Sequence, residues 1–151
     1  MPPSGFLSQS VLDTNVWVGN FLSRSPKSFN RRIVRLWLIE RRLKLAISNE
    51  IEAEYLRIFQ EVLGFDNQQI AEWRKRFSNR QTVKRVRLKL KTPISRDPKD
   101  DIFIHTALIS KADFLITNDF DLLEISETEK QKLKFQIVTP RTFLEQSEKL
   151  S

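Results

Sequence analysis

Short runs of consecutive apolar residues alternate along this chain with longer stretches in which apolar residues recur every three or four positions. The short runs predict β-strands, because a strand covered on both faces is apolar at successive positions. The longer stretches predict amphipathic helices. We expect strands at 10–12, 43–47, 114–116 and 135–138, and helices at 28–41, 51–62, 66–77 and 100–110, with a last helix after Thr139-Pro140.

Capping signals support two of these helices. Ser48 is a good N-cap for the helix after the second strand, and Glu50 lies in its first turn, where a negative charge complements the helix dipole. Pro140 follows Thr139 at the first helical position, where proline is favoured. Helices that alternate with short apolar strands predict an α/β fold, with a central parallel sheet flanked by helices on both faces.

Length and organisation indicate one domain. The chain has 151 residues, a common size for a compact domain, which can bury about two-thirds of its unfolded surface. It contains no internal repeat, no low-complexity tract and no Gly/Ser linker. We therefore expect a single domain over 1–151, with its core over about 10–145.

Composition excludes several classes of protein. The absence of cysteine excludes a disulfide scaffold, a cysteine-based zinc site and a thiol nucleophile, and it is typical of a reducing cytoplasm. The three glycines are far apart, so neither a GxGxxG nor a GxxxxGK[ST] phosphate-binding loop can form. The first residues lack the features of a signal peptide, and no apolar run is long enough to span a membrane. We expect a cytoplasmic protein that does not contact a membrane.

Positive charge is concentrated in one segment. The formal net charge is +7, the pI is near 9.9, and nine basic residues with no acidic residue lie between Arg74 and Lys91. Basic surfaces bind nucleic acids because neutralised phosphates release their counterions, although such a run can also be a solvated helix face and loop. The candidates for RNA contact are Arg74, Lys75, Arg76, Arg80, Lys84, Arg85 and Arg87.

Two aspartates closely follow predicted strands. Asp13 comes directly after the strand ending at Leu12, and Asp119 follows the strand 114–116 by way of Thr117 and Asn118. In an open parallel sheet, ligands bind at the carboxyl ends of the strands. Each aspartate is also a good N-cap for the helix that follows it, and this alternative has no need of a ligand.

Two further acids are candidates on helices. Glu54 lies closer to the apolar stripe of its helix than the neighbouring glutamates do, and a carboxylate at a buried face is costly unless it is paired or bound to a cation. Its alternative is a position at the rim of the core that reaches water. Asp100 continues the apolar face formed by Phe103 and Ile104, but Asp101 has a similar relation to its own helix, so spacing alone does not separate the two.

Acids that are brought together repel one another unless cations are present. Mg²⁺ and Mn²⁺ suit sites made of oxygen ligands, and they activate water for attack on phosphodiesters. An acidic pocket within a basic protein is therefore typical of a nuclease, in which the basic surface binds the backbone that the pocket cuts.

At this point the motifs resemble those of PIN-domain proteins. The resemblance covers about Ser10 to Glu145 and consists of five blocks in the family's order. These blocks are Leu12-Asp13-Thr14-Asn15-Val16, then Ser48-Asn49-Glu50-Ile51 with Glu54, then 96–101 followed by Ala107-Leu108, then 115–123, and finally 138–144, which is similar to a subgroup assigned as toxin components of toxin–antitoxin pairs (VapC-like).

The resemblance implies a set of site residues. The family's catalytic and metal-binding acids fall on Asp13, Glu54, Asp100 and Asp119, and the family spacing to Ala107 selects Asp100 over Asp101. Polar groups that the family often has near the pocket fall on Thr14, Asn15, Ser48 and Thr117.

The resemblance also implies a three-layer PIN-like fold and a function. We expect an endoribonuclease that hydrolyses single-stranded RNA with Mg²⁺ or Mn²⁺, the toxin of a toxin–antitoxin pair, with a cognate antitoxin protein as partner and a homodimer as its assembly. A non-catalytic RNA-binding module that uses the basic segment 74–91 is the alternative. A receiver-type domain would need a mid-chain phosphoacceptor aspartate and a well-placed lysine, and neither is found in the sequence.

Overall fold

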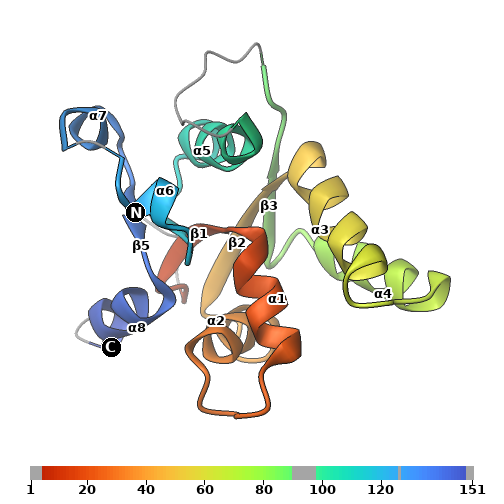
Figure 1. Cartoon of the computed structure of the whole chain (residues 1–151). Coiled ribbons are helices and arrows are strands. Elements are labelled where there is room, and N and C mark those ends of the chain that lie inside the picture. The colour runs from red at the N-terminus through yellow and green to blue at the C-terminus, as the bar shows by residue number, and fades with distance from the viewer. Residues whose placement is uncertain (1–4, 90–97, 126, 149–151) are drawn as a thin grey trace.

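The computed structural model of the protein describes residues 5–89, 98–125 and 127–148 (Figure 1). In this part of the chain, five strands form one parallel sheet in the order β3-β2-β1-β4-β5. The strands are β1 (Ser8–Leu12), β2 (Leu43–Ser48), β3 (Val83–Val86), β4 (Phe114–Ile116) and β5 (Gln136–Val138).

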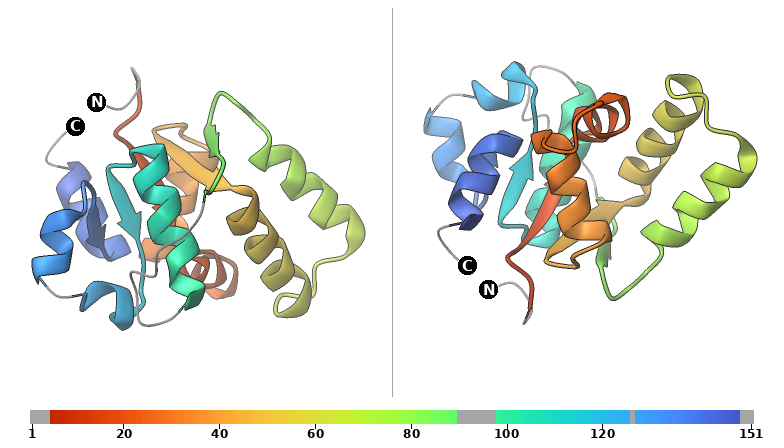
Figure 2. Two further views of the ribbon diagram at one scale, coloured as in Figure 1. Left: turned by 90° about the horizontal axis from the view of Figure 1, so that it is seen from above. Right: turned by 90° about the horizontal axis from the view of Figure 1, so that it is seen from below.

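Helices cover the two faces of this sheet. Helix α5 lies on one face, and α1, α2 and α8 lie on the other (Figures 1 and 2). The structure thus confirms the predicted α/β fold with a central parallel sheet flanked by helices. The helices are α1 (Thr14–Leu22), α2 (Phe29–Leu38), α3 (Asn49–Glu61), α4 (Asn67–Phe77), α5 (Pro98–Ser110), α6 (Phe120–Leu123), α7 (Glu127–Lys132) and α8 (Pro140–Glu148).

None of the helices in the described ranges is long and apolar enough to cross a membrane.

Four described elements, α1, β3 and the short helices α6 and α7, are absent from the expected strands and helices. Helix α1 buries Val16 and Trp17 but leaves Leu22 exposed, so its apolar residues do not mark one clear face. Strand β3 is short and lies at the edge of the sheet, where charged residues are tolerated because one side of the strand is unpaired. Part of the basic segment is therefore a strand rather than a helix face or a loop.

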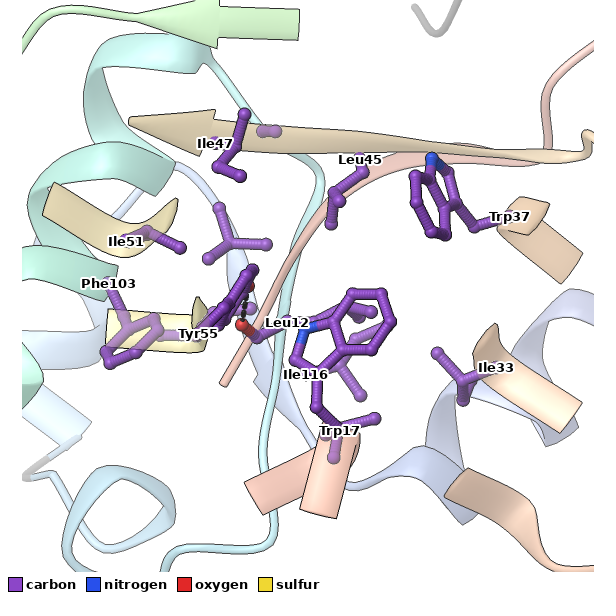
Figure 3. Packing of buried hydrophobic residues seen from close by; sticks show 14 of the residues in the cluster. Leu12, Trp17, Ile33, Trp37, Leu45, Ile47, Ile51, Tyr55, Phe103 and Ile116 are labelled. Atoms are coloured by element: carbon purple, nitrogen blue, oxygen red, sulfur yellow. Dashed lines mark hydrogen bonds between the residues drawn. The ribbon is translucent and has the colours of Figure 1, made fainter. Parts of the chain in front are cut away.

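An aromatic cluster fixes the helices beside the sheet. The rings of Trp17 and Tyr55 lie 5.4 Å apart, and those of Trp17 and Trp37 lie 5.6 Å apart (Figure 3). The Tyr55 hydroxyl donates a hydrogen bond to the Leu12 carbonyl, which joins α3 to the carboxyl end of β1. Trp73 and Phe77 of α4 pack on the same Trp17 ring. This core fixes α1 and α3 at the edge where Asp13 lies.

Candidate active site

The site lies where the order of the strands reverses. From β1 the chain continues to β2 and β3 on one side, and then crosses to β4 and β5 on the other side of β1. Ligands bind at the carboxyl edge of a parallel sheet at such a reversal. The Asp13 amide donates to the Ile116 carbonyl at 2.9 Å, so the residues that follow β1 and β4 lie side by side.

Asp13 is held by neutral donors on both carboxylate oxygens. Its Oδ1 accepts a hydrogen bond from the Thr14 amide at 2.7 Å. Its Oδ2 accepts hydrogen bonds from Thr117 Oγ1 at 2.7 Å and from Asn15 Nδ2 at 3.1 Å. Burial raises the pKa of Asp13, with a smaller contribution from the charge of Asp119, while these hydrogen bonds act in the opposite direction. Asp13 is only 5% exposed, so its charge is poorly solvated.

Thr117 links the two aspartates. Its hydroxyl donates to Asp13 Oδ2 and accepts a hydrogen bond from the Asp119 amide at 2.9 Å. Asp119 caps α6, because its Oδ1 accepts from the Asp121 amide at 2.8 Å, just as Asp13 caps α1. Both aspartates therefore act as helix N-caps, as the alternative interpretation expected. This role is compatible with a shared site, because capping fixes each carboxylate at the sheet edge.

A chain of asparagine amides extends from the site to α2. Asn15 Oδ1 accepts hydrogen bonds from the Asn118 amide at 3.1 Å and from Asn118 Nδ2 at 3.3 Å. Asn118 Nδ2 also donates to Asn30 Oδ1 at 3.0 Å. Sequence reasoning missed Asn118 and Asn30. The position of Asn118 between Thr117 and Asp119 in the fourth block could have indicated a place near the site. Nothing in the sequence points to Asn30.

Glu54 is engaged elsewhere in this structure. Its carboxylate forms a bidentate ion pair with Arg57, with Oε1 2.8 Å from Nη2 and Oε2 3.3 Å from Nε. Glu54 directly precedes Tyr55, whose hydroxyl bonds to Leu12, so α3 carries both residues close to the end of β1. Its role as a metal ligand stays a prediction, and it requires the carboxylate to leave Arg57.

Ser48 and Thr14 have different surroundings. Ser48 Oγ caps α3 by accepting from the Ile51 amide at 3.3 Å, and it lies 2.9 Å from Thr106 Oγ1 of α5. It therefore joins the end of β2 to two helices. Thr14 Oγ1 is buried and has no hydrogen-bond partner among the described residues.

Two of the four predicted acids are joined in the described structure. The backbone of Asp100 lies in the first turn of α5, but its side chain is outside the described part of the chain. Asp101 is buried and has a partner of its own. Within the residues that are described, no group of three or more acidic, histidine or cysteine side chains is arranged to hold a metal ion.

The donors around Asp13 fit a hard divalent cation. Among the described contacts, this buried carboxylate is neighboured by hydroxyl and amide groups and by a second carboxylate, and by no cationic side chain. A buried carboxylate costs free energy unless a cation or sufficient hydrogen bonds compensate for its charge. Oxygen ligands of this kind are those that Mg²⁺ and Mn²⁺ prefer.

Comparison with known proteins shows the family to which the chain belongs. The family model for the PIN domain matches residues 9–121, which include Asp13, Glu54, Asp100 and Asp119, and the chain therefore belongs to the PIN domain family. Proteins of this family are generally nucleases that depend on divalent metal ions.

Among solved structures, the protein is similar to a chain of VapBC2 from Rickettsia felis, bound to a DNA fragment from their promoter. The TM-score is 0.53 at 13% sequence identity, and the match covers 87% of this chain and 98% of that chain. At this identity the likeness is one of fold. No curated protein sequence matches the chain significantly.

Proposed function

We propose that this protein is an endoribonuclease that hydrolyses phosphodiester bonds of single-stranded RNA and depends on Mg²⁺ or Mn²⁺. One observation carries the proposal: a single hydroxyl, Thr117 Oγ1, joins the Asp13 carboxylate and the Asp119 backbone where the strand order reverses. Membership of the PIN domain family supports the nuclease class.

The aspartates hold the ion in this proposal, and Glu54 and Asp100 complete its ligands. An ion held there would supply an activated water and positive charge for hydrolysis of a phosphodiester bond. Asp13 acts as an ionised ligand, which the hydrogen bonds from Thr14, Asn15 and Thr117 favour because they lower its pKa.

The proposed partners are the RNA substrate, an antitoxin protein and a second copy of the chain. Basic side chains of the segment 74–91 contact the RNA backbone in this proposal, because its negative charge attracts them. The likeness of the closing block to the VapC-like subgroup, together with the fold shared with a chain of VapBC2, supports a toxin that pairs with an antitoxin protein. We further propose one PIN-like domain over the whole chain, and a homodimer in the cytoplasm.

The test compares wild-type protein with the Asp13→Asn variant on a mixed single-stranded RNA, in Mg²⁺, in Mn²⁺ and in EDTA. Cleavage by the wild-type protein alone, abolished by EDTA, is the expected result. If both proteins bind RNA and neither cleaves it, the non-catalytic RNA-binding module replaces the nuclease. If both cleave equally, Asp13 is not part of the site.

A further inference from the structure

A second recess lies beside the edge strand β3. It is a surface pocket of about 610 Å³ between β3, the carboxyl end of α4 and the start of α3. Three arginines line it, with Asn49 and Ser78 among their neighbours. We call it the arginine pocket, defined by Arg80, Arg85 and Arg87.

The three guanidinium groups differ in how they are held. Arg85 is fixed on three sides, because it donates to Asn49 Oδ1 at 2.8 Å, to the Glu52 carboxylate and to the Phe77 carbonyl at 3.3 Å. Arg80 and Arg87 are exposed and have no ion pair or hydrogen bond within the described residues. No acidic side chain lines the pocket. The arginine pocket therefore presents two available positive charges beside a third guanidinium whose charge is paired with Glu52.

Strand register places this pocket beside the aspartates. Ser10 is paired with Leu45, and Ser48 with Val86, so continuing the register by three residues brings Asp13 level with Ser48 and Val86. Strands β3 and β1 are separated by β2, which corresponds to about 10 Å at the usual strand spacing. That distance is short enough for one strand of RNA to contact the carboxyl end of the arginine pocket and the aspartates together.

Two other basic residues of the segment, Lys84 and Arg76, have contacts elsewhere. Lys84 extends from the opposite face of β3 and donates to the Ser110 carbonyl of α5 at 3.0 Å. The guanidinium of Arg76 lies over the Trp73 ring, 4.6 Å from its centroid. The basic run in the sequence is thus divided between several faces. The arginine pocket extends along β3, with Arg80 before the strand and Arg87 directly after its carboxyl end.

We infer that the arginine pocket binds a backbone phosphate of the single-stranded RNA, within a few nucleotides of the bond that is cut. This inference rests on the proposed function. The planar fork of an arginine matches the oxygens of a phosphate, and the two available forks form a site for one phosphodiester group.

The test measures binding of a labelled single-stranded RNA in EDTA, so that affinity is read without cleavage. The Arg80→Gln/Arg87→Gln variant removes the two available charges of the arginine pocket. The control, Lys111→Asn/Lys134→Gln, removes two exposed charges before β4 and β5, at the opposite edge of the sheet. Asparagine is chosen at Lys111 because its φ of 57° is one that asparagine tolerates.

The pocket variant is expected to weaken RNA binding by about 10-fold or more, because charge-assisted hydrogen bonds to phosphate are lost. Its plot of log affinity against log salt is expected to be shallower by about 0.7 for each phosphate contact removed from a single strand. The control is expected to change affinity by less than about 3-fold, as a change in general attraction at a distance screened by salt. Thermal unfolding of both variants checks that each is folded.

Two results would overturn the inference: equal loss of affinity in the two variants, or wild-type affinity in the pocket variant. A polyglutamate peptide that displaces labelled RNA from the wild type as effectively as unlabelled RNA does would assign the pocket to an acidic protein instead. Failure of the proposed function is a separate result, because wild-type protein would then bind RNA through the pocket and cleave nothing in Mn²⁺.

Discussion

The asparagine chain beside the site makes a specific prediction about Gly19. Helix α1 passes so close to Asn30 that a Cβ on Gly19 would lie 2.2 Å from Asn30 Nδ2 and 2.7 Å from its Cγ. Gly19→Ala therefore forces the Asn30 amide to move. That movement breaks the hydrogen bond from Asn118 Nδ2 to Asn30 Oδ1, which restrains the loop carrying Asp119.

Two opposing terms set the effect on stability. Alanine is favoured over glycine in a helix interior by about 1 kcal/mol. The lost hydrogen bond costs about 0.5–1.5 kcal/mol. The free energy of unfolding of Gly19→Ala should therefore stay within about 1 kcal/mol of the wild type. The rate of RNA cleavage should fall by about 10-fold. This is the lower end of the loss found when a residue that orients a metal ligand is replaced.

A second substitution separates these terms. Asn30→Ala removes the amide that an alanine at position 19 would meet. The remaining Cβ at position 30 would lie 3.2 Å away, a tight contact that a shift of a few tenths of an ångström relieves. In the Asn30→Ala background, Gly19→Ala should raise the free energy of unfolding by about 1 kcal/mol, which corresponds to about 2–4 °C in Tm. Urea unfolding and initial rates of RNA cleavage on the four proteins form the complete cycle.

Two results of this mutant cycle would contradict the proposed role of the Asn30 amide. If Gly19→Ala stabilises the wild type as much as it stabilises Asn30→Ala, the Asn30 amide is not constrained by α1. If cleavage is also unchanged in Gly19→Ala, the asparagine chain does not position the site.

Three further predictions concern the carboxylates. Thr117→Val removes the hydroxyl that lowers the pKa of Asp13, so the acidic limb of the pH–rate profile should move to higher pH; an unmoved limb would show that Asp13 does not control it. In EDTA, the free energy of unfolding of the wild type should fall relative to that of Asp13→Asn as pH rises from about 3.8 through the raised pKa of Asp13. The reason is that the folded state binds the Asp13 proton more tightly than the unfolded state does. A difference between the two proteins that stays constant with pH in urea unfolding would contradict this. Arg57→Gln frees Glu54 and should tighten Mn²⁺ binding in titration calorimetry, whereas Arg141→Gln, which breaks a similar helical pair elsewhere, should not; equal affinities would remove Glu54 from the ligand set.

The sequence predicted most of the fold because its strongest patterns come from burial. Strands β2 and β4 are buried at nearly every position, and Ser48 caps α3 as its position indicated. Strand β3 escaped detection because two of its four residues are charged, and its pairing with β2 depends on tertiary contacts rather than on local pattern.

The sequence predicted part of the candidate site, namely the two aspartates that follow neighbouring strands. Asp13 and Asp119 follow strands that pair directly, so the topology alone brings them together. Glu54 could not be resolved in this way, because its ion pair with Arg57 depends on side-chain conformations that helical spacing permits but does not select. Asn30 lies 88 positions from its partner Asn118, and no local pattern could join residues so far apart.

The most direct test of the metal-dependent nuclease compares substitutions of two aspartates, each of which caps a helix. Asp119→Asn removes a charge at the site, while Asp66→Asn changes an exposed cap of α4 to a residue that caps equally well. On a fluorogenic single-stranded RNA in saturating Mn²⁺, we predict that Asp119→Asn lowers the cleavage rate by about 100-fold or more and that Asp66→Asn leaves it unchanged. Equal rates for the two variants would contradict the assignment of the catalytic centre to Asp13 and Asp119.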